Sequence, residues 1–196
     1  MSLSNETIQQ KLTEKFGEAL TEWQQPYGML TFTAPKDLNL KILQFLFDDA
    51  ELRFQFLTDL QAVHYPERKG EELAVVYHLH NLRDNVRLRM KVFAPVEKPD
   101  VFSATALYAS ANFMERETYD FFGVNFVGHP NLIRILNVDE MDYFPMRKEF
   151  PLEDQTRIDK DDEMFGRCGT QGFGTEKTTH GTLAEEDKHN EGSQVL

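Results

Sequence analysis

The centre of the chain alternates apolar and polar residues with the two-residue period of a β-strand. The segments 73–79 and 86–93 follow this pattern, and the polar residues 83–85 between them predict a hairpin. Two sets of side chains point to opposite faces of the second segment: Val86, Leu88, Met90 and Val92 on one, and Arg87, Arg89 and Lys91 on the other. We therefore expect one buried sheet face, and one locally basic face that is open to water or to an acidic partner.

Two helices are predicted before this hairpin. Residues 8–23 carry apolar side chains at steps of three and four, with Ser4 as the expected N-cap and the turn at 26–28 as the end of the helix. A second helix is expected to begin near Pro35 and to bury one face within 38–46. Further strands are predicted at 29–33, 52–56 and 60–65.

A third helix is predicted to end at Phe122, because Gly123 follows as a natural helix stop. The stripe expected to face the core consists of Leu107, Ala111, Met114, Thr118 and Phe121. The opposite side of the helical wheel carries Asn112, Glu115, Arg116, Tyr119 and Asp120. Arg116 precedes Asp120 by four residues, which brings the two side chains within reach of each other.

The chain after this helix is expected to become less regular. Residues 124–126 read as extended and 132–136 as one more short apolar element. The segment from Pro145 to Pro151 is charged, and its two prolines have fixed φ angles. Such a segment suits a strip that lies on the surface of another protein.

Together these elements predict an α+β fold, with a mixed or antiparallel sheet packed with helices on one side. Residues 1–152 form the expected domain. Residues 153–196 hold eleven Asp or Glu against five Lys or Arg and few large apolar residues, so we expect an acidic tail that is disordered or draped over partner proteins.

Composition narrows the classes of function. A formal net charge of -12 over 196 residues argues against nucleic acid as a partner. No apolar run reaches the length that spans a bilayer, and the first residues resemble neither a signal peptide nor a transit peptide, so a membrane link is expected to come through partners. Cys168 is the single cysteine, which leaves too few thiolates for an iron-sulfur cluster.

The region from the third helix onward contains a dense set of short motifs: Glu115-Arg116-Glu117, Tyr119-Asp120, Phe122-Gly123, Phe126, Gly128-His129-Pro130, Arg134-Ile135-Leu136, Pro145-Met146-Arg147-Lys148 and Pro151-Leu152. In these motifs the chain resembles the C subunit of NADH-quinone oxidoreductase, the 30 kDa subunit family of respiratory complex I. A weaker resemblance extends upstream to Phe54.

The resemblance implies a non-catalytic structural subunit in the peripheral arm of a proton-translocating complex, on the cytoplasmic face of the bacterial inner membrane. It implies docking on the quinone-site (D) subunit, near the iron-sulfur (B and I) subunits. Iron-sulfur clusters and FMN are expected in partner subunits of the complex, which passes electrons from NADH to quinone, and no catalytic, cofactor or metal residue is expected in this chain. The expected subunit-interface residues are Glu115, Arg116, Glu117, Tyr119, Asp120, His129, Pro130, Arg134, Pro145, Arg147, Lys148 and Pro151.

The alternative is a self-sufficient soluble enzyme with a carboxylate and histidine site around Glu117 and His129. Glu115 and Glu117 lie about 200° apart on a helical wheel, so the two carboxylates cannot both point into one site. His78 and His80 have the spacing of two metal ligands on one strand face, with His64 as a conceivable third. We favour the structural role over both readings.

Overall fold

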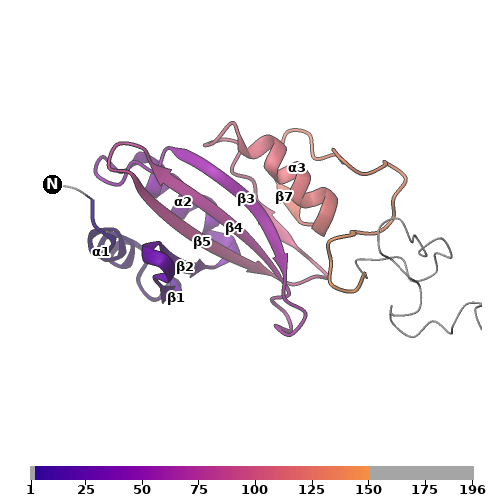
Figure 1. Ribbon diagram of the computed structural model, residues 1–196, viewed down its shortest axis with the longest axis horizontal. Coiled ribbons are helices and arrows are strands. Elements are labelled where there is room, and N and C mark those ends of the chain that lie inside the picture. Colours follow the sequence, from indigo (N-terminus) through magenta and orange to yellow (C-terminus); the bar gives the residue numbers. More distant parts are fainter. Residues whose placement is uncertain (1–2, 151–196) are drawn as a thin grey trace, which may run out of the picture. The chain divides into compact units, whose positions relative to one another are not determined.

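The computed structural model describes residues 3–150, and its main feature is a five-stranded mixed sheet (Figure 1). The strands lie in the order β1-β2-β5-β4-β3. Their bounds are β1 Thr21–Gln24, β2 Leu30–Ala34, β3 Phe56–His64, β4 Leu73–Asn81 and β5 Val86–Ala94. Neighbours are antiparallel except β2 and β5, which run parallel. The predicted α+β fold with a mixed sheet is confirmed.

The helices are α1 (Asn5–Phe16), α2 (Asn39–Asp48) and α3 (Ala111–Phe122). The Ser4 hydroxyl accepts a hydrogen bond from the amide of Thr7, which confirms Ser4 as the N-cap of α1. A small parallel sheet pairs β6 (Asp100–Phe102) with β7 (Asn125–Val127). None of the helices within residues 3–150 has the length and apolar character needed to cross a membrane.

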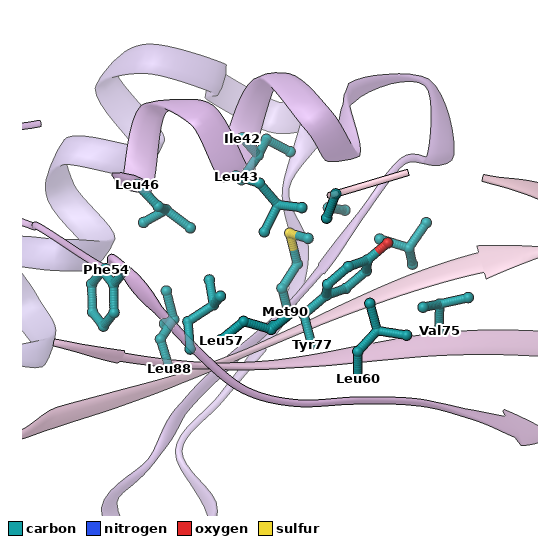
Figure 2. Packing of buried hydrophobic residues seen from close by; sticks show 14 of the residues in the cluster. Ile42, Leu43, Leu46, Phe54, Leu57, Leu60, Val75, Tyr77, Leu88 and Met90 are labelled. Atoms are coloured by element: carbon teal, nitrogen blue, oxygen red, sulfur yellow. The ribbon is translucent and has the colours of Figure 1, made fainter. Parts of the chain in front are cut away.

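The hydrophobic core lies between α2 and one face of the large sheet (Figure 2). Ile42, Leu43 and Leu46 point from α2 toward the strands, where Tyr77 and Met90 form a cross-strand pair beneath them. All five side chains are fully buried. The alternation predicted for β5 is confirmed, because its apolar residues fill this face while Arg87 is exposed and Arg89 and Lys91 are half-buried on the other.

Helix α3 packs beside β3. Two hydrogen bonds connect the chain from β6 to the start of α3 with α2 and with the segment before β3. The Asn39 amide of α2 donates to the carbonyl of Phe102 at 2.7 Å. The Tyr108 hydroxyl, just before α3, donates to the carbonyl of Phe54 at 2.7 Å. These contacts fix the position of α3 without a regular element between β6 and the helix.

Three local predictions are wrong. The first helix ends at Phe16, and Trp23 lies on β1, because Gly17 takes a positive φ of 58° that breaks the helix. Residues 52–55 are not a strand, although Leu52 and Phe54 are buried. The short apolar element predicted at 132–136 is neither a helix nor a strand, and its Ile133 and Leu136 are exposed. The expectations for 153–196, including Cys168, lie outside the described residues.

Candidate subunit interface at the end of α3

The buried side of helix α3 carries polar as well as apolar side chains. Ala111, Glu115 and Thr118 face the interior, and the helix ends at Phe122 as predicted. Gly123 follows with a φ of 78°, a left-handed conformation that glycine adopts without a Cβ clash. The prediction that places Glu115 and Asp120 on the exposed side is wrong, because both side chains are fully buried.

Asp120 is the centre of the hydrogen bonding around this helix end. Its carboxylate pairs with the Arg134 guanidinium at 2.7 Å. It also accepts from three consecutive backbone amides, those of Ile135, Leu136 and Asn137, at 3.1, 2.8 and 2.9 Å. Burial by itself would raise the pKa of Asp120, but the four donors outweigh it and hold this pKa well below its usual range.

The last carbonyl groups of α3 receive donors from the chain that follows. Arg134 donates to the carbonyl of Asp120 at 3.0 Å, the Met146 amide to that of Phe121 at 3.2 Å, and Arg147 Nε to that of Phe122 at 2.8 Å. Carbonyl groups at a helix end lack partners within the helix and carry partial negative charge, so two arginines are favourable there. Residues 134–147 thereby cap the helix.

The Phe144 ring is close to both arginines. The guanidinium carbon of Arg147 is 4.6 Å from the ring centroid, and that of Arg134 is 5.3 Å away. The ring also covers Gly123, where an added Cβ would come within 2.5 Å of Phe144 and 2.7 Å of Arg147. Gly123 is therefore required for both its backbone angle and its missing side chain.

Arg116 and His129 hold the start of the same loop through backbone contacts. Arg116 donates to the carbonyls of Ile133 and Arg134 at 3.2 and 3.0 Å, so the predicted pairing of Arg116 with Asp120 is wrong. His129 Nε2 donates to the carbonyl of Asn112 at 3.1 Å, while Nδ1 accepts from the Asn131 amide at 3.0 Å. Both ring nitrogens of His129 are thus engaged, which leaves neither for proton transfer or metal binding in this conformation.

Glu115 is a buried carboxylate that receives two neutral donors. The hydroxyl of Ser103 and the amide of Ala104 both donate to it at 2.6 Å. Burial raises the pKa of Glu115 to about 7, although the two hydrogen bonds act in the opposite direction. This contact joins α3 to the segment after β6.

The remaining predicted interface residues differ in exposure. Glu117, Pro130 and Lys148 are exposed, Tyr119 and Pro145 are half-buried, and Pro151 lies outside the described residues. The structure thus gathers Asp120, Arg134 and Arg147 into one internal network around the helix end. Their role at a subunit interface stays a prediction.

The predicted histidine ligands do not gather. His78 pairs across strands with Asp59, whereas His64 pairs with Leu73, and these register positions face opposite sides of the sheet. His64 is buried and accepts a hydrogen bond from the Lys148 amide at 3.0 Å. Within residues 3–150, no three His, Cys, Asp or Glu side chains lie together in a way that would hold a metal ion.

Sequence reasoning missed the exposed apolar side chains in the loop after β7. Ile133, Leu136, Val138, Tyr143 and Met146 are all exposed. The sequence does contain an indication of this exposure. Beyond residue 136 the apolar residues follow neither a helical nor a strand period, so the pattern assigns them to no buried face.

Comparison with known proteins extends this picture. A family model described as "Respiratory-chain NADH dehydrogenase, 30 Kd subunit" matches residues 32–156. The NADH-quinone oxidoreductase C subunit of Citrifermentans bemidjiense is 43% identical over 149 residues, which cover 75% of this chain and 89% of that protein. The C subunit of the Streptomyces coelicolor enzyme is 42% identical over 125 residues, or 64% of this chain, and the match spans only 50% of that longer relative.

Two solved structures share the fold. A trypsin-resistant fragment of Nqo5 superposes with a TM-score of 0.56 at 32% identity, covering 64% of this chain and 98% of the fragment. A chain of the membrane-bound sulfane sulfur reductase, an archaeal respiratory membrane complex, gives a TM-score of 0.64 at 26% identity, covering 80% of this chain and 97% of that one. Since the family model matches more than half of its length, the chain belongs to the family of the 30 kDa subunit of the respiratory-chain NADH dehydrogenase.

Proposed function

We propose that this chain is a non-catalytic structural subunit in the peripheral arm of a proton-translocating NADH-quinone oxidoreductase. Its family membership supports the assignment to complex I. The observation that carries the structural role is the Asp120–Arg134 network, which holds an irregular loop against the end of α3 and leaves apolar side chains of that loop exposed. Such a surface suits contact with another protein.

In this role the chain docks on the quinone-site (D) subunit and lies near the iron-sulfur (B and I) subunits. The iron-sulfur clusters and FMN of the complex reside in partner subunits, and this chain holds none of them. The complex transfers electrons from NADH to quinone at the cytoplasmic face of the bacterial inner membrane. This chain has a structural role in the complex. Helix α3 and the strip after Pro145 form parts of its contact surface.

The geometry around Glu117 and His129 supports a structural role over a catalytic one. General acid or base catalysis requires a side-chain atom within hydrogen-bond reach of the reacting group. Both nitrogens of His129 are hydrogen-bonded to the backbone, and Glu117 is exposed on the outside of α3. Within residues 3–150, no hydrogen bond brings Glu117 and His129 together in a common site.

A purification from native membranes tests the proposal. The full chain, carrying an affinity tag, is recovered in mild detergent, and the companions are identified and quantified by mass spectrometry. We expect the quinone-site subunit and the iron-sulfur subunits in amounts equal to the tagged chain. Recovery of the chain alone from the soluble fraction would overturn the proposal. The identity of the companions would also reveal the electron donor.

A further inference from the structure

The loop after β7 exposes several large apolar side chains within a short stretch of the chain. Residues 3–150 expose eleven large hydrophobic side chains, and five of these lie within the fourteen residues 133–146. They are Ile133, Leu136, Val138, Tyr143 and Met146. Exposed apolar residues are ordinary when scattered, but concentration on one short loop is typical of an interaction site.

This loop has a defined conformation although it contains neither helix nor strand. Asp120 binds the amides of residues 135–137, and Arg134 donates to the carbonyls of Met141 and Tyr143 as well as to Asp120. The Met146 amide closes the loop onto α3. A surface that is ordered before binding loses less conformational entropy when it docks.

The charge of the loop limits what can cover it. Asp139, Glu140 and Asp142 are exposed, and none of the ion pairs formed within residues 3–150 includes them. The two arginines of the region, Arg134 and Arg147, are directed toward the end of α3. The outward side of the loop is therefore apolar and acidic.

Three other occupants fit this charge poorly. A second copy of the chain has a formal net charge of -12, and in the basic row of β5 only Arg87 is exposed, while Arg89 and Lys91 are half-buried. Residues 153–196 are also acidic. An anionic membrane surface would likewise repel three exposed carboxylates. A protein surface with positive charge would attract them.

We infer that loop 133–146 is a docking surface for a partner subunit, and that the partner presents an apolar surface with a basic rim. The inference rests on the proposed function, since it supplies the contact through which the structural subunit is held. Apolar contact with Leu136 and Val138 provides affinity, while the carboxylates of Asp139, Glu140 and Asp142 select a basic partner.

Leu136 and Leu82 provide a matched pair for the test, because both side chains are 66% exposed and Leu82 lies far from the loop in sequence, between β4 and β5. A photo-reactive phenylalanine analogue is placed at each position in the tagged full chain, which is then irradiated within native membranes. We expect position 136 to cross-link to a partner subunit, at a peptide containing Lys or Arg, and in higher yield than position 82.

Substitutions test the two parts of the surface separately. Leu136→Ser should lower recovery of partner subunits roughly tenfold, as expected for loss of a buried leucine contact, and Leu82→Ser should not. Neutralisation by Asp139→Asn, Glu140→Gln and Asp142→Asn should weaken association and reduce its sensitivity to salt. The control is a set of three carboxylates that are also exposed, Glu18→Gln, Glu67→Gln and Glu97→Gln.

The outcomes separate this inference from the proposed function. Cross-links from position 136 to a second copy of the chain or to its own residues 153–196, or no cross-links in an intact complex, would overturn the docking inference while the proposed function stands. Equal effects of Leu136→Ser and Leu82→Ser would also overturn it. Failure of the unmodified chain to recover any subunit of the complex would overturn the proposed function itself.

Discussion

Asp120 and Arg134 form an almost fully buried ion pair, with 2.7 Å between Oδ1 and Nη1, although fourteen positions separate them in the chain. Asp120 lies in the last turn of a regular helix, and Arg134 lies near the start of the irregular loop that folds back over that helix end. Each partner also binds the backbone of the other's segment. The pair therefore determines where the loop lies.

Asp120→Asn should destabilise the folded chain by about 3–5 kcal/mol at pH 7, because it leaves the Arg134 guanidinium buried without its charged partner. Urea unfolding measures the change, and the exposed Asp139→Asn serves as the control with little expected effect.

The same variant has a predicted pH dependence. The pKa of Asp120 is lower in the folded chain than its ordinary value of 3.8, so the stabilisation from its ionised form is complete above that value. It is lost as the pH falls below 3.8 toward the folded pKa. The difference between wild type and Asp120→Asn should therefore shrink in acid, and a difference independent of pH would contradict the assignment.

Glu115→Gln should behave in the opposite way. Because burial raises the pKa of Glu115 from 4.5 to about 7, ionising it disfavours the folded state, and wild-type stability should fall relative to the variant as the pH rises from 4.5 to 7. The glutamine oxygen can still accept from Ala104. We expect an advantage for Glu115→Gln at pH 8 of up to roughly 3 kcal/mol, and none at pH 4.

Urea unfolding at pH 4 and pH 8 compares Glu115→Gln with Glu117→Gln, which removes an exposed carboxylate from the same helix. If the two variants show the same pH dependence, the carboxylate of Glu115 is not held in the buried contact with Ser103 and Ala104.

Gly123→Ala and Gly128→Ala separate backbone strain from crowding. Both glycines have positive φ, 78° and 88°, so alanine is strained by about 1–2 kcal/mol at either position. Only at position 123 does the new Cβ meet the Phe144 ring and Arg147, whereas nothing lies within 4 Å at position 128. Thermal unfolding should show the greater loss for Gly123→Ala, and equal losses would mean that Phe144 does not cover Gly123 in solution.

Arg147→Glu should destabilise the chain by about 1–3 kcal/mol, because it removes a charged donor to the Phe122 carbonyl and places negative charge at the C-terminal end of α3. The sequence alone suggests Arg147 only as a contact for another subunit. Lys148→Glu makes the same change in charge at an exposed side chain, and its effect on the melting temperature should be small.

The elements that could be predicted from the sequence are those determined by local patterns. Ser4 caps α1, Gly123 ends α3, and alternation predicts the β4–β5 hairpin with its buried face at Met90. Local periodicity also misleads at Trp23, where the helical spacing continues past the glycine that ends the helix.

The network around Asp120 could not be predicted because its partners are distant in the chain. Charged residues are rarely buried unless paired, so a helical wheel places Glu115 and Asp120 outside. Their partners, Ser103 before the helix and Arg134 after it, become visible only once the chain folds back. The exposed Leu136 is the reverse case, an apolar residue for which residues 3–150 provide no core.

If this chain shapes the complex and takes no part in its chemistry, NADH-quinone turnover per assembled complex should not depend on the candidate acid and base residues. Glu117→Gln and His129→Gln are introduced into the full chain, the assembled complex is quantified, and turnover is divided by that amount. We predict the wild-type rate per complex for both variants, even where the amount of complex falls. A large loss of turnover in a fully assembled complex would contradict the claim and favour a catalytic site at Glu117 and His129.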